Sequence, residues 1–372
     1  MLRVAHLTTV HSALDHRIFR KECRSLARAG YAVTIIGPHR ADGQEESIAI
    51  RAIAKPQSRV LRMTETVWRL YRAALRETAD VYHFHDPELI PIALLLRAHG
   101  KKVIYDVHED YPKDIYYKPY LPRFVRRAIS SIVESMEVAA ARHFSAVVAV
   151  TPAIAGRFAA ANEKTVIVRN FPYREELLDG CAQPWDARRV AAAYVGTVSP
   201  QRGISEMVQA AGLLPPSLGA TLEIAGEEVP QQITRQAGWM RVRHHGILDQ
   251  RSTYDLLRHV RVGLSCQHPI PTFVDSIPVK IFEYMGAGLP IIVSNFPFWR
   301  QMLEEFRCAI FVNPLNPREI ASALEYLLAN SAEAEAMGRR GQAAVALQFN
   351  WNSESKTLVD LYAGLIGAPC AA

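Results

Sequence analysis

The sequence predicts an α/β protein built from two doubly wound, Rossmann-like domains that face each other across a cleft. Short β-rich runs alternate with amphipathic helical stretches, which is the pattern of parallel strands joined by helical crossovers. The alternation occurs twice, and the segment FPYREELLDGCAQPWDARR, which begins after Asn170, interrupts it. With 372 residues, of which 49% are hydrophobic and 22% charged, the chain has room for two globular cores.

The first series occupies residues 1–170. Strands are expected at 3–10, 32–38, 80–85, 102–108, 146–150 and 165–170, with helices between them, such as 18–29 and 88–99. In a doubly wound sheet, functional side chains gather beyond the carboxyl ends of the strands. His11, His85 and His108 fall at such ends.

The second series occupies residues 171–350. Strands are expected at 190–198, 220–226, just before Gly246, and at 260–266, 290–294 and 308–312. Residues 351–366 form a further predicted helix. Two open sheets in tandem leave a cleft, which is a favoured place for a ligand.

The most informative segment is DSIPVKIFEYMGAGLP, Asp275 to Pro290. Pro278 suits the first turn of a helix, and glycines end that helix before the next strand. The free N–H groups and positive dipole end of such a helix favour phosphate. Asp275 and Glu283 stand eight residues apart, and a purely structural helix needs neither. The alternative is that Asp275 caps the helix and Glu283 is a solvated residue.

A second segment, YVGTVSPQRGISEMVQAA, begins at Tyr194. A strand ends at Gly196, and a helix begins near Gly203. Glycines allow the backbone to approach a diphosphate, and Arg202 offers a planar fork of donors to neutralise it. An ordinary strand-to-helix turn with a surface arginine is the alternative.

Histidines mark two strand ends of the first series. His108 lies in YDVHEDYP, followed by Glu109 and Asp110, and HFHDPE places His83 and His85 on one face of a strand. With Asp86 and Glu88 the latter pair suggests a metal site, but no further ligand cluster has suitable spacing and D-x-D is absent. We therefore expect no metal and no cofactor.

Together these segments resemble retaining glycosyltransferase family 4, which has the GT-B fold. The resemblance implies that Asp275 contacts the sugar of a nucleotide-sugar donor, that Glu283 holds its ribose and that Arg202 binds its diphosphate. His108 matches the strand-end histidine that touches the transferred sugar. His108, Arg202 and Asp275 are thus the expected catalytic residues, and the expected donor-binding residues are Gly196, Thr197, Arg202, Gly203, Asp275, Ser276, Ile277, Pro278, Val279 and Glu283. The chain departs from the family in having Asp275 instead of glutamate and Thr197 instead of arginine.

The resemblance assigns acceptor binding to residues 1–170, joined by the terminal helix 351–372, and donor binding to residues 171–350. The first strand-to-helix loop, within TVHSALDHRIFRKE, lacks the glycines that many GT-B enzymes have there. Ser12, Asp15, His16 and Arg17 are candidates to replace them, or Asp15 caps a helix. His85 and Glu109 complete the expected acceptor side.

The charge is uneven along the chain. Residues 1–170 carry 26 Lys+Arg against 17 Asp+Glu, a net +9, and the remainder carries 17 against 20, a net −3. Basic residues accompany apolar and aromatic residues in the stretches 59–76 and 116–127, which suits an anionic membrane surface. A solvated helix face is the alternative for each stretch. No nucleic-acid motif is present, so a nucleic-acid partner is not expected.

Five scattered cysteines without C-x-x-C fit reduced thiols, and no apolar run reaches the ~18 residues of a membrane span. The first residues do not form a signal-peptide pattern. The expected location is therefore cytoplasmic and peripheral on the inner face of the cell membrane.

The expected function is metal-independent, retaining transfer of a sugar from a nucleotide-diphosphate sugar to a glycan or lipid-linked acceptor, in cell-surface polysaccharide or lipopolysaccharide biosynthesis. Three alternatives remain: a GT-B sugar-nucleotide epimerase, an inactive homologue that binds nucleotide or glycan, and a Rossmann dehydrogenase. The last is poorly supported, since no G-x-G-x-x-G follows the first strand.

Overall fold

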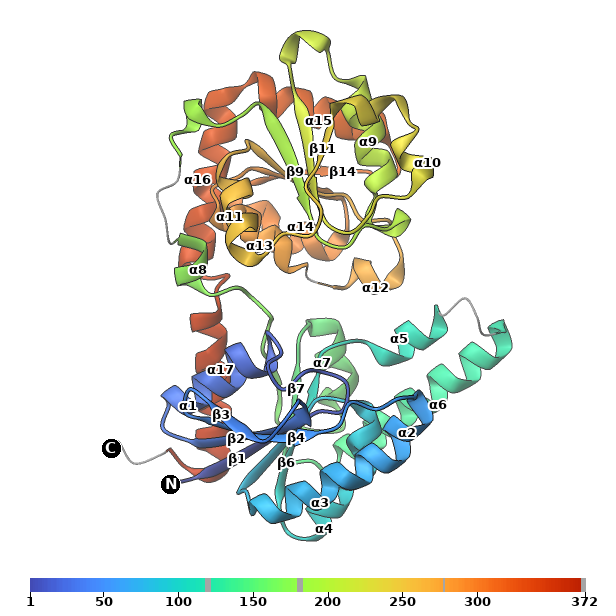
Figure 1. Ribbon diagram of the computed structural model, residues 1–372, viewed down its shortest axis with the longest axis vertical. Helices are drawn as coiled ribbons and strands as arrows, with labels where there is room; N and C mark the ends of the chain where they lie inside the picture. The colour runs from blue at the N-terminus through green and yellow to red at the C-terminus, as the bar shows by residue number, and fades with distance from the viewer. Residues whose placement is uncertain (118–121, 179–182, 277, 369–372) are drawn as a thin grey trace. The chain divides into compact units, whose positions relative to one another are not determined.

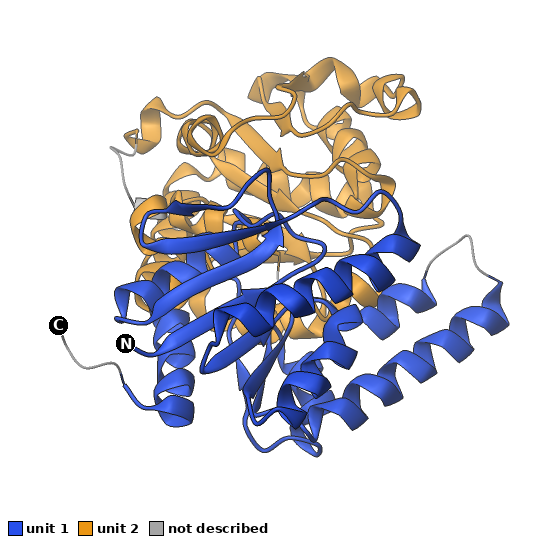
Figure 2. Ribbon diagram, turned by 60° about the horizontal axis from the view of Figure 1, so that its bottom comes forward, with its two compact units in different colours: residues 1–170, 352–372 blue, residues 171–351 orange. Residues whose placement is uncertain are grey.

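The computed structural model describes residues 1–117, 122–178, 183–276 and 278–368. The chain forms two compact units (Figures 1 and 2): unit 1 comprises residues 1–170 and 352–372, and unit 2 comprises residues 171–351. Each unit contains one open, largely parallel sheet with helices packed on it. The predicted fold class, two Rossmann-like α/β domains, is therefore confirmed.

The sheet of unit 1 has the order β3-β4-β2-β1-β5-β6-β7-β8, and β3 is its antiparallel strand. Its strands are β1 (Arg3–Leu7), β2 (Ala32–Pro38), β3 (Gly43–Glu45), β4 (Ile48–Ile53), β5 (Val81–Phe84), β6 (Lys102–Val107), β7 (Ala146–Ala149) and β8 (Thr165–Ile167). Its helices are the π-helical η1 (Ile18–Cys23), α1 (Arg24–Arg28), α2 (Arg59–Leu61), the π-helical η2 (Arg62–Thr66), α3 (Val67–Glu77), α4 (Ile90–Ala98), α5 (Tyr111–Tyr116), α6 (Arg123–Ala141), α7 (Pro152–Ala159) and α17 (Trp351–Ile366).

The two faces of this sheet differ in chemistry. Alternate residues of β1, β5 and β6, among them Leu7, Phe84 and Tyr105, join the apolar core under α3, α4, α6 and α7. In Figure 1, α3 and α4 run along this side of the sheet. The intervening residues point to the opposite face and are buried as well, although several of them are polar. That face carries the candidate site of unit 1.

The C-terminal helix α17 packs on the polar face. The hydroxyl of Tyr362 lies 2.8 Å from Nδ1 of His83 on β5, and Tyr31 donates a hydrogen bond to the carbonyl of Gly367. Glu354 accepts from the backbone N–H of Arg169 at 2.7 Å. The last residues of the chain are thus part of unit 1 and not of the unit that precedes them in sequence.

The sheet of unit 2 is parallel throughout, with the order β11-β10-β9-β12-β13-β14. Its strands are β9 (Ala191–Val195), β10 (Thr221–Ala225), β11 (Val242–His244), β12 (Val262–Ser265), β13 (Ile291–Ser294) and β14 (Ala309–Val312). Its helices are α8 (Arg174–Leu178), α9 (Ile204–Leu213), α10 (Gln231–Thr234), α11 (Gln250–Arg258), α12 (Pro271–Val274), α13 (Val279–Gly286), α14 (Pro297–Leu303), α15 (Pro317–Ala329) and α16 (Ser331–Leu347).

The strand order of unit 2 reverses at one place. From β9 the chain adds β10 and β11 on one side, then returns to place β12 on the other side of β9. In open α/β sheets ligands bind beyond the carboxyl ends of the strands at such a switch point. A ligand site is therefore expected at the segments that follow β9 and β12.

Several predicted boundaries differ from the structure. The first strand ends at Leu7 and not at residue 10, because Thr8 and Thr9 turn to bind the buried carboxylate of Asp86. The helix expected at 18–29 begins with the π-helical η1, and strands β3 and β4 were not predicted. Among the described residues, no helix combines the length and hydropathy that crossing a bilayer requires.

Candidate functional site

The candidate site of unit 1 lies on the polar face at the carboxyl ends of β1, β5 and β6. Because strand side chains alternate between faces, His6, His83 and Asp106 point to the same side. His6 pairs in register with His83 across neighbouring strands. His85 and His108 follow β5 and β6 directly, so they extend the same row.

Asp106 is the centre of this cluster. Its carboxylate accepts from Nε2 of His108 at 2.7 Å and from Nη2 of Arg17 at 3.2 Å, and Nδ1 of His85 lies 3.3 Å away. Burial by itself would raise the pKa of Asp106, but the attraction of Arg17 and His108 outweighs it and holds the pKa well below its usual range. Asp106 is therefore an ionised, fully buried acceptor. Its hydrogen bond with Nε2 fixes the orientation of the His108 ring, which lies nearer the surface.

One set of tautomers satisfies the contacts of these buried histidines. If Nδ1 of His85 donates to Asp106, then Nε2 of His85 accepts from Nδ1 of His6 at 3.0 Å. Tyr362 then donates to Nδ1 of His83, which leaves the Nε2 proton of His83 facing Asp106 at 3.8 Å. Burial lowers the pKa of His85 to about 4, and it lowers the pKa values of His6 and His83 well below normal, so these rings are neutral at pH 7.

The same network fixes the tautomer of His108. Because Nε2 donates to Asp106, the neutral tautomer compatible with this contact has an unprotonated Nδ1 that can accept a hydrogen bond. The side chain of His108 is 10% exposed, whereas that of Asp106 is fully buried. His108 is thus the member of the row that a ligand can reach.

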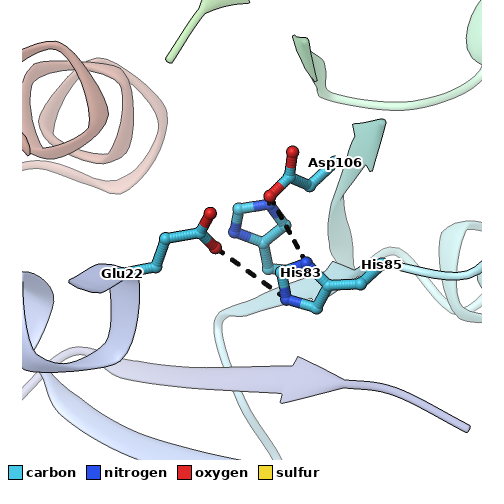
Figure 3. Close-up of side chains that lie close together, drawn as sticks. All are labelled: Glu22, His83, His85 and Asp106. Atoms are coloured by element: carbon cyan, nitrogen blue, oxygen red, sulfur yellow. Dashed lines mark ion pairs between the residues drawn. The ribbon is translucent and has the colours of Figure 1, made fainter. Parts of the chain in front are cut away.

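Four buried groups of this cluster have the chemistry of metal ligands. Glu22, His83, His85 and Asp106 place one ligand-type atom each within 4.8 Å of one another (Figure 3). The guanidinium of Arg17, however, already pairs with both carboxylates, at 2.9 Å from Glu22 and 3.2 Å from Asp106. A buried cation therefore already supplies the charge that a metal ion would bring. The metal set considered from sequence, with Asp86 and Glu88, is not the set that the fold brings together.

The acceptor-side residues predicted from sequence are placed in two environments. Ser12 lines a pocket of about 940 Å³, together with the basic residues Arg40, Lys55, Arg59 and Arg62. Glu109 is exposed beside His108. Arg17 and His85 are buried in the cluster described above, so a direct contact of either with an acceptor does not fit this placement. Both support Asp106 and His108 instead.

Asp15 organises the glycine-free loop after β1. Its Oδ1 accepts from the backbone N–H groups of Arg17 and Ile18 at 2.7 and 3.0 Å, at the start of η1. Its other oxygen lies 3.6 Å from Nδ1 of His11. Asp15 thus binds the backbone at the start of η1, whose N-cap residue is Arg17, and its proposed acceptor role stays a prediction.

The candidate site of unit 2 lies at the switch point, in the loop between β9 and α9. Gly196 has φ 126° and Gly203 has φ 76°, which side chains rarely adopt. A Cβ on Gly203 would stand 1.9 Å from the carbonyl oxygen of Cys266, which follows β12. The loop thus packs against the end of β12 as closely as its glycines allow. Arg202 lies in this loop, and its guanidinium stacks 4.4 Å from the ring centroid of Phe273.

The segment predicted as most informative begins just after α12 and forms α13. Asp275 ends α12, and the N-cap residue of α13 is Pro278, so the alternative that Asp275 is this helix's N-cap residue does not hold. Val279 opens α13, and Glu283 lies partly buried in its middle. The carbonyl of Ser276 accepts from the indole N–H of Trp299 at 2.9 Å. The predicted donor-binding residue Ile277 lies outside the described residues.

Sequence reasoning missed several residues of both sites. Glu22, Asp106 and Tyr362 complete the unit 1 cluster, and Lys280 places its ammonium over the ring of Tyr194 in unit 2. The polar residue Asp106 within a predicted buried strand was a signal that could have been followed. For Lys280 the sequence holds no such signal, because the contact joins residues 86 positions apart.

Comparison with known proteins adds sequence and structural likenesses. The profile of Glycosyltransferase Family 4 matches residues 16–171, and that of a glycosyl transferase-like domain matches residues 202–360. An uncharacterized glycosyltransferase of Methanocaldococcus jannaschii is 24% identical over 173 residues, which make up 45% of this chain and 43% of that protein. The match thus spans less than half of that relative's length.

Solved structures match over nearly the whole chain. Sucrose-phosphate synthase from Thermosynechococcus elongatus superposes with a TM-score of 0.77 at 16% identity, over 99% of this chain and 100% of that one. HepE of Anabaena, solved in complex with UDP, gives 0.74 at 15% identity over 98% and 100%. At such identities these likenesses show a shared fold.

Proposed function

The chain belongs to glycosyltransferase family 4 and has the GT-B fold, and from this premise we propose that it is a retaining, metal-independent enzyme that uses a nucleotide-diphosphate sugar. The acceptor is a glycan or a lipid-linked glycan, and the pathway is the assembly of cell-surface polysaccharide or lipopolysaccharide. The observation that carries the proposal is the switch point of unit 2, where Arg202 lies in the loop before α9 and Lys280, in the first turn of α13, lies against Gly196.

The reaction needs charge stabilisation more than a protein nucleophile. As the bond from the anomeric carbon to the diphosphate breaks, negative charge grows on the diphosphate and positive charge on the sugar ring. Arg202 and the start of α13 stabilise the leaving diphosphate. The acceptor hydroxyl attacks from the same face, and the leaving phosphate takes its proton. Glu283 holds the ribose, and Asp275 and Nδ1 of His108 accept hydrogen bonds from sugar hydroxyls.

Unit 1 provides the acceptor side in this proposal. The pocket that contains Ser12 opens beyond the carboxyl ends of β1, β2 and β4, next to the loop that carries His11. The ring of His11 lies 5.7 Å from that of His108. An acceptor held in the pocket would therefore lie close to the residue proposed to contact the transferred sugar.

A donor screen tests the function. UDP-, GDP- and ADP-sugars are each added in a thermal-shift assay, and one of them is expected to raise the melting temperature, since a ligand bound to the folded state stabilises it by RT ln(1+[L]/Kd). Glu283→Ala should weaken that donor at least about tenfold, because a charge-assisted hydrogen bond contributes ~1.5–3 kcal/mol. Transfer of labelled sugar to an envelope-lipid extract then reports the reaction.

Two results would contradict the proposal. A protein that no nucleotide sugar stabilises is not a glycosyltransferase of this kind. Activity that EDTA abolishes and manganese restores would overturn metal independence, because Arg202 is proposed to supply the positive charge.

Location at the inner face of the cell membrane is a further part of the proposal. The N-terminal end of α6 carries Arg123, Arg126 and Arg127, and the same helix exposes Phe124 (76%) and Ile132 (66%) to solvent. Lys118, predicted to belong to this basic stretch, lies outside the described residues. Basic residues beside exposed apolar ones suit the surface of an anionic bilayer.

We expect the protein to sediment with phosphatidylglycerol-containing vesicles but not with neutral ones, and less so as salt rises. Replacing Arg123, Arg126 and Arg127 with glutamate should reduce sedimentation. The matched control replaces Arg235, Arg251 and Arg318, which are exposed on unit 2, with glutamate. Equal sedimentation of the two triple variants would show that α6 is an ordinary solvated helix.

A further inference from the structure

Lys280, in the first turn of α13, reaches back to the end of β9. Its Nζ lies 3.9 Å from the ring centroid of Tyr194, and a Cβ added to Gly196 would stand 2.8 Å from it. The hydroxyl of Tyr194 donates to the carbonyl of Thr197 at 2.6 Å, which fixes the ring beneath the ammonium. In the described part of unit 2, no carboxylate forms an ion pair with Lys280.

A second cation, Arg202, lies in the loop before α9, close enough for its charge to repel that of Lys280. Burial lowers the pKa of Lys280 to about 7, and repulsion from Arg202 adds to this, whereas Glu283 on the same helix opposes it. Arg202 likewise has no ion-pair partner among the described residues of this unit. Two neighbouring cations, neither bridged by a carboxylate, are unfavourable in the empty protein, and an anion bound between them relieves the repulsion.

We infer that Lys280, together with Arg202, binds the diphosphate of the donor and so supplies the cation that the resemblance to family 4 places at Thr197. The inference rests on the proposed function. Thr197 is exposed and uncharged, so it cannot fill that role. Lys280 brings a positive charge to the same turn of backbone from a different element, since its Nζ lies against Gly196, next to Thr197.

A purely structural role for Lys280 and a role in anion binding predict opposite effects on the melting temperature of the ligand-free protein. If its cation–π contact with Tyr194 held α13 to β9, Lys280→Met would lower the melting temperature without ligand. If Lys280 serves an anion, the same change removes a partly buried charge repelled by Arg202. The empty Lys280→Met protein should then melt at the same temperature as the parent or higher.

The test measures binding by calorimetry, with UDP, GDP or ADP according to which one binds the parent, and with the matching nucleotide sugar. Lys280→Met is expected to weaken both at least about tenfold, because a charge-assisted contact to phosphate is lost. Lys280→Arg, which keeps the charge, should retain most of the affinity. Thr197→Arg in the Lys280→Met background should recover part of it, since it restores the cation of the family pattern.

The pH dependence gives a second readout. In the free parent Lys280 loses its proton as pH rises through about 7, and binding of an anion then requires protonation. Affinity for the nucleotide sugar, whose diphosphate does not titrate in this range, should therefore fall between pH 7 and 9. Lys280→Met should lack this fall.

The outcomes separate this inference from the proposed function. Unchanged affinity and an unchanged pH profile in Lys280→Met overturn the role of Lys280 and leave the function standing. Weakened binding by Lys280→Met, in a parent that binds donor but transfers no sugar, supports the role of Lys280 and removes the transferase. A parent that binds no nucleotide overturns both.

Discussion

Replacing Arg17 with methionine is expected to lower the free energy of unfolding of unit 1 by about 3–5 kcal/mol. The change leaves Glu22 and Asp106 as buried carboxylates without their cation, and breaking a buried ion pair costs that much because one charge stays uncompensated. Methionine fills much of the same volume, so the loss of stability reflects the missing positive charge and not the creation of a cavity. Urea unfolding measures this loss as a shift of the transition midpoint, provided that the m-value is unchanged.

The loss should depend on pH. Burial, with repulsion from Asp106, raises the pKa of Glu22 well above normal, so stability linked to Glu22 is present at low pH and is lost as pH rises. Without Arg17 that pKa rises further. Arg17→Met should therefore cost less at pH 5 than at pH 8.

The control is Arg24→Met, which breaks the half-exposed pair with Glu46 and should cost no more than about 1 kcal/mol. If Arg17→Met were as mild as Arg24→Met, the cluster would have to be hydrated. Its arrangement would then not be what fixes His108.

The sheets were predictable because their strands are apolar runs bounded by polar or glycine-rich turns. The run AVTIIGP gave β2 with both its limits, and PIIVS gave β13 within one residue. The pair β3 and β4 escaped prediction because Gly43–Glu45 is polar and fully exposed, and Arg51 interrupts the second run. The exposed edge strand β3 has no core side to impose a periodic pattern, although β4 beside it buries Ile48, Ile50 and Ile53.

The candidate sites were predictable where they are local in sequence. The loop from Gly196 to Gly203 and the helix that carries Glu283 each form one continuous segment, so spacing and residue type revealed them. Asp106 and Arg17 are 89 positions apart, and each can be buried because the opposite charge of the other compensates it. Such pairs require the strand order, which the sequence pattern does not supply.

The second large effect is expected in catalysis, for Arg202→Ala. If the guanidinium meets charge that grows on the leaving diphosphate, kcat should fall by about 10²–10³, as for other donors aimed at a developing anion. Affinity for the donor should also fall, since the diphosphate is already charged in the ground state. The fall should be no more than about tenfold, because Lys280 remains nearby. Steady-state turnover and calorimetric donor affinity give the two numbers separately.

The matched variant is Arg202→Lys, which retains the charge but loses the planar fork and the stacking on Phe273. Its kcat should lie between those of the parent and Arg202→Ala, with donor affinity near that of the parent. Weakened donor affinity with kcat unchanged in Arg202→Ala would show that Arg202 anchors the donor before reaction and contributes nothing further in the transition state. Charge stabilisation would then have to come from the start of α13 and from Lys280, and Lys280→Met would be the variant with the larger loss of turnover.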